Sequence, residues 1–376
     1  MKEGHTMLSR NKRCHPILWI AIAILLFCSC SINTVSPPLA FTVTPWPRAD
    51  ALFHSDSRWQ GADDAYSVDL GDGRVLWLFG DSLITGPNGI DRSDAVLIRN
   101  SVAIQKGYNP ARSKVDFYWR ETGGVPDAFF PVEGQTWLWP GDGERIGRNL
   151  LLFFMEIGPA DNPLGFAMVG WRTVLVSNPD DPPLNWRLRW LQTPPNDFRA
   201  MVGSGSVFAR GEHLYALAYR EHTRDVLLAR WDLAAARRGN LEPIQWWCGT
   251  DRQWVPQGEM KTVPTVLFSE GQAELTVHHD PRYEGYLGIQ TVGFGPAHVA
   301  MRHAPYLTGP WSDATQIHAP KETAIPDVMI YAAKAHPHLI GADLVLTYCT
   351  NSFVYENVLK DNRLYYPRFL KISRQR

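Results

Sequence analysis

The sequence has few cysteines outside its first thirty residues. Of the five cysteines, only Cys248 and Cys349 lie beyond that segment. No zinc-binding spacing can be built from two cysteines. In an oxidising compartment the two could form a disulfide, and as buried free thiols they would behave as small apolar side chains. The sequence leaves both alternatives open.

The sequence also lacks a long run of basic residues beyond its first thirteen positions. The formal net charge is −1 at pH 7, with 37 Lys and Arg against 38 Asp and Glu. A protein that binds nucleic acid usually presents a basic stripe or patch to the phosphates. We therefore expect no nucleic-acid partner.

Several catalytic motifs are absent as well. The string GSGSV at 203–207 is followed by a strand pattern and not by a helix, which excludes a phosphate-binding loop. There is no Gly-x-Ser-x-Gly nucleophile elbow and no repeated Ser-x-Asp-x-Gly-x-Thr-Trp box of the sialidase type. Helical periodicity is almost absent apart from residues 233–238. These absences leave an all-β chain without the signature of a common hydrolase.

The N-terminal segment has the features of an export signal. Basic residues precede the apolar run 17–27, which has the length of a signal-peptide core and is short for a membrane span. The following string LLFCSC resembles the bacterial lipobox, in which the cysteine, here Cys30, is lipidated. An uncleaved anchor and an ordinary secretory signal are the alternatives. We expect residues 1–30 to be a signal or lipoprotein segment, 31–40 a tether, and the remainder extracytoplasmic, touching the membrane only through the lipid.

The body of the chain repeats one pattern five times: an alternating strand, a short polar turn and a strongly apolar strand. The second strands of the repeats begin near Leu76, Leu150, Leu214, Tyr286 and Leu344. Each hairpin is followed by a third strand candidate, and the first four repeats have a fourth. Four-stranded units repeated around an axis form a β-propeller, whereas a β-sandwich of similar strand count would not predict five copies of one hairpin.

The fifth repeat has no fourth strand candidate of its own. We expect the strand FTVTP, residues 41–45, to supply it by pairing beside residues 365–372 and closing the ring. The sequence thus predicts a five-bladed β-propeller with four-stranded blades, in which residues 41–376 form a single domain.

Four stretches of the sequence resemble a known family. They are WQGADDAYSVDLGDGRVLWLFGDS, GFAMVGWRTVLVSNPDDPPLNW, APYLTGPWSD, and KAHPHL followed by YYPRF. They resemble an uncharacterised bacterial family of secreted domains related to the five-bladed propeller glycoside hydrolases, a clan that includes arabinanases, xylosidases and invertases. The resemblance covers most of residues 55–372. It implies the propeller fold, a glycan ligand and catalysis by three carboxylic acids from different blades.

Carboxylates at the beginnings of the innermost strands are the candidate catalytic groups, because these strands converge on a central funnel. Asp64 precedes the first inner strand and matches the clan's catalytic base, and Asp63 beside it is an alternative. Glu274 opens an apolar strand, where a charge is costly unless it is paired or functional, and is the candidate acid. The clan's acid lies one blade earlier, where this sequence has MVGSGSV and no carboxylate. Asp142 is the candidate third acid, unless it serves only in a tight Gly-Asp-Gly turn.

Asp81 ends a second strand in the string WLFGDS. Aspartate commonly caps turns by bonding to its own following backbone. We therefore expect Asp81 to be structural and to lie in a turn or at the rim opposite the catalytic carboxylates.

Other residues are candidates for ligand binding. Trp137 and Trp139 flank a first-strand beginning and could stack on sugars, although packed blades use the same rings. Arg172 and Lys334 could donate to a ligand in the funnel or form structural salt bridges. His336 could hold a hydrated calcium ion at the propeller axis or a substrate hydroxyl. Apart from this calcium ion we expect no cofactor.

Two functional hypotheses follow. The first is an extracytoplasmic, lipid-anchored glycoside hydrolase acting on an oligo- or polysaccharide. Its mechanism would be inverting, with Asp64 as base and Glu274 as acid across the funnel and Asp142 tuning the acid. The alternative is a propeller that binds carbohydrate or protein and has lost the catalytic acid.

Overall fold

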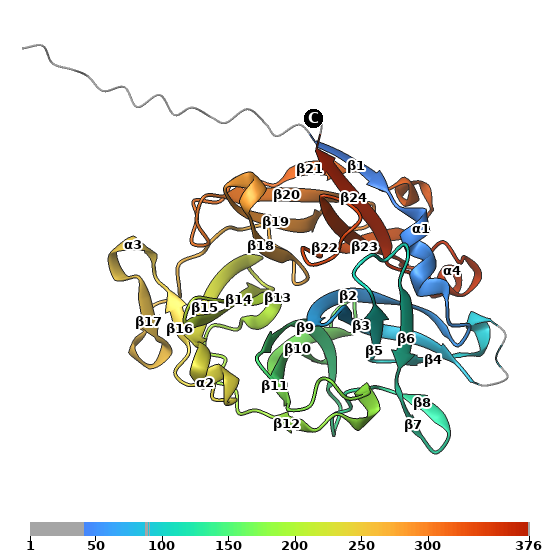
Figure 1. Ribbon diagram of the computed structural model, residues 1–376, viewed down its shortest axis with the longest axis horizontal. Helices are drawn as coiled ribbons and strands as arrows, with labels where there is room; N and C mark the ends of the chain where they lie inside the picture. The colour runs from blue at the N-terminus through green and yellow to red at the C-terminus, as the bar shows by residue number, and fades with distance from the viewer. Residues whose placement is uncertain (1–40, 87–88, 90, 375–376) are drawn as a thin grey trace, which may run out of the picture. The chain divides into compact units, whose positions relative to one another are not determined.

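The computed structural model describes residues 41–86, 89 and 91–374 (Figure 1). The expected signal segment 1–30 with Cys30, and the tether 31–40, lie outside the described residues. Within the described ranges no helix has the length and apolar character needed to cross a membrane. The two cysteines of the described chain, Cys248 and Cys349, are free.

The described strands form five main sheets, which we number as blades in chain order. Blade 1 contains β2 (Trp59–Gly71), β3 (Arg74–Thr85), β5 (Ser101–Lys106) and β6 (Lys114–Tyr118), with β4 (Ala95–Ile98) paired to β3. Blade 2 contains β9 (Trp137–Ile146), β10 (Asn149–Pro159), β11 (Phe166–Val176) and β12 (Leu188–Trp190). Between these two blades, β7 (Arg120–Thr122) and β8 (Val125–Asp127) form a small hairpin.

The remaining three blades follow the same order. Blade 3 contains β13 (Met201–Arg210), β14 (His213–Arg220), β15 (Asp225–Asp232), β16 (Gln245–Trp247) and an additional strand β17 (Trp254–Pro256). Blade 4 contains β18 (Thr276–Asp280), β19 (Gly285–Val292), β20 (His298–Ala304) and β21 (Thr315–His318). Blade 5 contains β22 (Val328–Ala335), β23 (Leu344–Ser352), β24 (Arg368–Arg374) and β1 (Phe41–Pro45). The described α-helices are short: α1 (Pro47–Asp50), α2 (Leu233–Arg237), α3 (Gly249–Arg252) and α4 (Tyr355–Lys360).

The first strands of the blades surround the axis. β2 contacts β9, β9 contacts β13, and the series continues through β18 and β22 back to β2 (Figure 1). The predicted fourth strands of blades 1 to 4 are β6, β12, β16 and β21. The five-bladed propeller predicted from the repeats is therefore confirmed.

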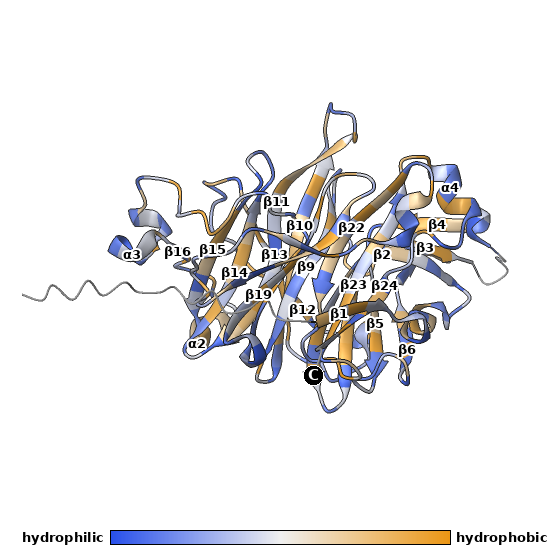
Figure 2. Cartoon of the chain, turned by 90° about the horizontal axis from the view of Figure 1, so that it is seen from above, coloured by the Kyte–Doolittle hydropathy of each residue, from blue (hydrophilic) through white to orange (hydrophobic). Residues whose placement is uncertain are grey.

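Strand periodicity explains the apolar second strands. Successive side chains of a strand point to opposite faces, and each blade is covered on both faces by its neighbours. On β10, Phe153 packs in the layer between blades 2 and 3, and Phe154 packs in the layer between blades 1 and 2. Five such clusters, one between each pair of neighbouring blades, make up the core. Figure 2 shows the apolar residues concentrated along the strands, and each fully buried Phe or Leu contributes roughly 1.5–3 kcal/mol.

The N-terminal strand closes the ring as predicted. β1 pairs antiparallel with β24, with Thr42 opposite Ser373 and Pro45 opposite Leu370. The side chains of Phe41 and Val43 pack against the layer between blades 4 and 5. The two ends of the described chain are thereby held in one sheet (Figure 1).

Candidate active site

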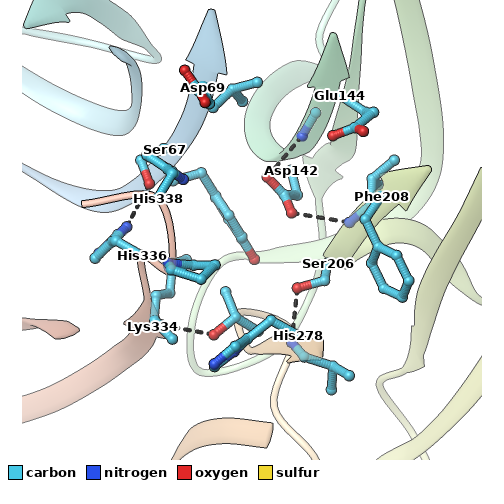
Figure 3. Close-up of a pocket in the computed structure, with 18 of the residues that line it drawn as sticks. Ser67, Asp69, Asp142, Glu144, Ser206, Phe208, His278, Lys334, His336 and His338 are labelled. Carbon is cyan, nitrogen blue, oxygen red and sulfur yellow. Dashed lines mark hydrogen bonds between the residues drawn. The ribbon is translucent and has the colours of Figure 1, made fainter. Parts of the chain in front are cut away.

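The inner strands enclose two cavities that follow one another along the same strands. The first, which we call the carboxylate cavity, has a volume of about 350 Å³ and is lined by residues at the beginnings of inner strands, in the second strands β3, β10 and β23, and in nearby loops. The second, which we call the histidine cavity, has a volume of about 220 Å³ and is lined by later residues of the same strands (Figure 3). The carboxylate cavity contains the following charged or aromatic residues: Asp63, Asp64, Asp81, Glu274, Trp139, Phe166, Phe294, Tyr331 and Tyr365.

Two consecutive aspartates reach the carboxylate cavity because β2 is bulged. In a regular strand, Asp63 and Asp64 would point to opposite faces. The register of β2 with β3 shifts on both sides of Asp64, and Asp64 and Ala65 have φ values of 73° and 59°. A left-handed conformation costs a non-glycine residue about 1–3 kcal/mol. The bulge brings both carboxyl groups to one cavity, at a cost that the packed blade must offset.

Asp63 is half-buried in surroundings whose net effect favours its protonated form. The Tyr331 hydroxyl donates a hydrogen bond to Asp63 Oδ2 at 2.7 Å, which by itself favours the ionised form and lowers the pKa. A β-carbon at Gly80 would lie 2.5 Å from Asp63 Oδ1, so only glycine leaves room for this carboxyl. Burial raises the pKa of Asp63 well above its usual value, and the neighbouring carboxyls of Asp81 and Glu274 raise it further because like charges repel. Asp63 is suited to hold a proton.

Asp81 lines the same cavity, contrary to the expectation of a turn at the opposite rim. It lies inside β3, which continues to Thr85. Trp139 Nε1 donates to Asp81 Oδ1 at 2.8 Å, and Arg99 pairs with Oδ2 at 3.0 Å. Burial raises the pKa of Asp81 to about 6, although both partners oppose the increase. The sequence prediction was wrong because Gly80 interrupts the apolar run without ending the strand.

Lys334 supplies a buried positive charge between the two cavities. Its side chain is 0% exposed, and Nζ lies 3.1 Å from Asp64 Oδ1 and 3.3 Å from Glu274 Oε1. Nζ also donates to the main-chain oxygen of Asp64 at 2.6 Å and lies 4.2 Å from the centre of the Tyr66 ring. Burial acts to lower the pKa of Lys334, but the two carboxylates outweigh it and the net pKa is raised.

Asp64 and Glu274 are therefore neighbours that share one ammonium group, and they do not face each other across the funnel as expected. Asp64 is 2% exposed. Its burial raises its pKa well above the usual value, Lys334 opposes this, and contact with Glu274 raises it again. The Glu274 side chain is 19% exposed. Of the two carboxyls, Glu274 has the better access to a ligand in the cavity.

Asp142 lies in the histidine cavity, so the three predicted catalytic carboxylates do not meet. It is not in a turn but inside β9, where the register with β10 shifts. Its oxygens accept hydrogen bonds from the main-chain N–H groups of Gly143 at 2.8 Å and Val207 at 2.9 Å. Burial raises the pKa of Asp142 to about 7. The bond from Val207 connects blade 2 to blade 3.

His336 also belongs to the histidine cavity (Figure 3). Its Nδ1 lies 2.5 Å from the Ser67 hydroxyl oxygen, and its Nε2 lies 2.8 Å from Thr347 Oγ1. Burial lowers the pKa of His336 well below its usual value, so the ring is neutral. Among the described residues, no three or more His, Cys, Asp or Glu side chains are grouped to hold a metal ion. With both ring nitrogens engaged, His336 does not fit the expected calcium ion.

The other predicted binding residues divide between the cavity and its surroundings. Trp139 lines the carboxylate cavity. The ring of Trp137 packs at 6.3 Å from that of Trp139 and beneath the Arg99 guanidinium at 4.3 Å. Arg172 forms an ion pair with Glu156 at 2.7 Å. In the described chain, Trp137 and Arg172 are not among the residues lining either cavity.

Sequence reasoning missed Asp81 and Tyr331 as members of the site. A signal existed for Asp81, because Asp63 and Asp81 lie at equal separations from Asp72 in the turn of their hairpin. Residues placed in this way face each other across the strands, and like charges there are destabilising. Such a pair indicates a functional site. No comparable pattern marks Tyr331, which reaches Asp63 from blade 5.

A comparison with protein families matches residues 48–374 to a domain of unknown function, DUF5005. The chain belongs to this family. The DUF5005 domain described here also resembles solved structures. A Bacteroides ovatus protein described as a hydrolase has a TM-score of 0.68 and 16% identity, over 88% of this chain and 90% of that chain.

More distant structures include the catalytic domain of a GH62 α-L-arabinofuranosidase from Coprinopsis cinerea. Its TM-score is 0.48 at 11% identity, over 90% of this chain and 97% of that chain. An endo-arabinase from Bacteroides thetaiotaomicron has a TM-score of 0.44 at 11% identity, over 84% and 94% of the two chains. A comparison of this DUF5005 chain with curated protein sequences gives no significant match. The family and the fold expected from the sequence resemblance are confirmed.

Proposed function

We propose that this DUF5005 propeller is a glycoside hydrolase whose carboxylate cavity binds and cleaves a glycan. The observation that carries the proposal is the meeting of Asp63, Asp81 and Glu274 around one cavity at the propeller axis. Glycoside hydrolysis needs a carboxylic acid that gives a proton to the leaving oxygen and a second carboxylate on the other side of the reacting carbon. Trp139 offers an aromatic face of the kind that stacks on sugar rings.

The environments of the carboxyls suggest roles that differ from those expected from the sequence. Asp63, whose pKa is raised by burial and by its acidic neighbours, is the proton donor. Glu274, ion-paired with Lys334, takes a proton from the attacking water. Asp64 is buried beneath Lys334 and holds the ammonium group against Glu274. A carboxyl that its environment keeps protonated is the usual general acid of such a pair.

The resemblance of the sequence to propeller glycoside hydrolases supports a glycan as the ligand. The Bacteroides ovatus protein described as a hydrolase shares the fold. Fold likeness alone does not fix an activity, so the proposal depends on the carboxylate cavity. A screen of plant and bacterial glycans identifies the sugar and the linkage.

The test is release of reducing sugar from plant and bacterial glycans by the full chain. We expect one substrate to be cleaved. Asp63→Asn and Glu274→Gln should each lower kcat about 100-fold or more with little change in binding, because acid and base groups act in the transition state. Asp116→Asn and Glu121→Gln are matched controls. Both side chains are exposed and pair with Lys106 and Arg58, away from the cavity.

Activity should also fall as pH rises through the pKa of Asp63, because only its protonated form can donate. If the double variant Asp63→Asn with Glu274→Gln kept full activity, these residues would carry no chemistry. If the wild type bound a glycan without cleaving it, the alternative hypothesis of a non-catalytic binding propeller would replace the hydrolase.

We also propose that the protein is exported and held at a bacterial membrane by lipid on Cys30. The support is the signal-like segment with its LLFCSC string. An extracytoplasmic location would give the carboxylate cavity access to cell-wall or environmental glycans.

A further inference from the structure

The histidine cavity contains a polar side chain for which the fold supplies no partner. His278 on β18 lines the cavity and is 9% exposed. Neither of its ring nitrogens has a hydrogen-bond partner among the described residues. Asp280 Oδ2 lies 4.0 Å from Nε2, beyond hydrogen-bond distance, and pairs instead with Arg282. An unsatisfied buried polar group is unfavourable, and a ligand that bonds to it removes this cost.

Other polar groups converge on the same space from different blades. Nε2 of His338, after β22, is buried and has no partner among the described residues. One oxygen of Glu144 on β9 accepts a hydrogen bond from the main-chain N–H of Ala209 at 3.1 Å. The other accepts none from the described chain. Figure 3 shows His278, His338 and Glu144 placed around one opening.

The walls between these groups are apolar. Val68, Val207, Phe208, Val277 and Pro337 line the cavity. A concave, largely apolar space with a few converging polar groups is the usual form of a small-molecule site. With a volume of about 220 Å³, the cavity has room for one small ring and not for a chain.

The charges of the cavity limit the chemistry of its ligand. Asp69, Asp142 and Glu144 line it, and burial raises the pKa of the last two to about 7, so they are only partly ionised at neutral pH. Lys334, the cation among the described lining residues, is already paired with Asp64 and Glu274, so the lining offers an anion no unpaired positive charge. Burial lowers the pKa values of His278 and His338 to about 4, so both rings are neutral at pH 7 and offer no compensating positive charge. The described residues form no metal-binding group of three or more ligands. A neutral imidazole has one donor and one acceptor, and a carboxylate accepts. Hydroxyl groups complement this set.

We propose that the histidine cavity is a second, non-catalytic binding site for a single neutral sugar ring. His278, His338 and Glu144 bond to its hydroxyl groups, and Phe208 with the valines packs against its apolar face. The site is separated from the carboxylate cavity by Lys334 and Asp64, which form an ion pair on the axis. It therefore binds sugar whether or not the carboxylate cavity is catalytic.

The test is a titration of the full chain, carrying isotopically labelled histidine, with methyl β-D-xylopyranoside, methyl β-D-glucopyranoside and methyl β-D-galactopyranoside. We expect at least one glycoside to shift the imidazole NMR signals of His278 and His338 saturably, with a Kd on the order of millimolar. His278→Leu should weaken this binding at least tenfold. Trp139→Ala removes the aromatic face proposed to stack on sugars in the carboxylate cavity and is the control, which should bind the glycoside equally well.

Several outcomes would overturn the proposal. They are the absence of a saturable shift with every glycoside, an unchanged Kd in His278→Leu, and loss of the shift in Trp139→Ala, which would place the sugar in the carboxylate cavity. A saturable shift with inorganic phosphate and none with the glycosides would identify an anion site instead. If His278→Leu does not fold by circular dichroism, Glu144→Gln provides the same comparison. If only the imidazole NMR signals of exposed histidines move when the wild type is titrated, the proposal is wrong and no variant is needed to show it.

Discussion

At the scale of single residues, the propeller axis is notable for carboxyl groups that the fold holds in their less ionised form. Burial raises the pKa of Asp81 to about 6 and those of Asp142 and Glu144 to about 7. Burial also raises the pKa values of Asp63 and Asp64 well above the usual value. A carboxyl of this type can donate a proton near neutral pH, which an ordinary surface aspartate cannot do.

The raised pKa of Asp142 makes the stability of the protein depend on pH. An acid whose pKa is higher in the folded state contributes stability that is fully present below its unfolded pKa, here 3.8, and is lost as pH rises through its folded pKa of about 7. The shift corresponds to roughly 4 kcal/mol. Asp142→Asn removes the titration but gives up one of the two main-chain hydrogen bonds, at about 1 kcal/mol.

We therefore expect Asp142→Asn to be less stable than the wild type at pH 5 and equally or more stable at pH 8. Urea denaturation at both pH values measures the difference. Asp116→Asn, an exposed aspartate on β6, controls for the substitution itself. A deficit of the same size at pH 5 and pH 8 would contradict the assigned shift.

The sequence predicted the site only in part, for reasons that are visible at particular residues. Asp63, Asp64 and Glu274 were found because a carboxylate at the beginning of an apolar strand is unusual. Asp81 was placed at the wrong rim because a Gly-Asp pair normally ends a strand, and here Gly80 makes space for the Asp63 carboxyl. Tyr331 could not be found, because its contact with Asp63 depends on the closure of blade 5 against blade 1.

At the scale of elements, bulges decide which side chains reach the axis. Register shifts occur in β2, β9, β13 and β22, the first strands of four blades. The pattern of apolar residues predicts the hairpins, because each second strand is buried on both faces and is therefore almost continuously apolar. It does not predict a bulge, because a bulge changes the alternation by one residue. The short strands β7, β8 and β17 were also not foreseen, because they lie outside the repeated four-strand pattern.

The ring-closing strand β1 gives an element-scale prediction. Val43 packs against the layer between blades 4 and 5, whereas Thr42 on the other face is exposed. Val43→Asp should lower the free energy of unfolding by about 1–3 kcal/mol, because it places an unpaired charge against an apolar layer. Thr42→Asp is the matched control and should change it by less than about 0.5 kcal/mol.

Chemical denaturation of both variants measures these effects. Equal losses in Val43→Asp and Thr42→Asp would show that β1 adds no packing to the ring. The sequence predicted the fold as far as this ring-closing strand. Apolar and polar residues alternate in FTVTP, and the fifth repeat lacked a fourth strand of its own.

At the scale of the whole molecule, the proposed location determines which glycans the proposed hydrolase can meet. The proposed lipid anchor predicts that cells fed a fatty-acid probe incorporate it into the wild-type protein, and that Cys30→Ala loses the label. Cys349→Ala is the matched control, because that cysteine is buried inside the propeller. An unlabelled wild type found in the medium would indicate an ordinary secretory signal.

The pairing of β1 with β24 also determines when the protein can finish folding. β1 is the first strand of the propeller to leave the ribosome, and its partner is the last, since Thr42 lies opposite Ser373. The entropy of closing a loop grows with its length, and contacts between distant residues slow folding. Blade 5 cannot be completed until synthesis of the domain has ended. Until then the ring of blades stays open between β1 and β24.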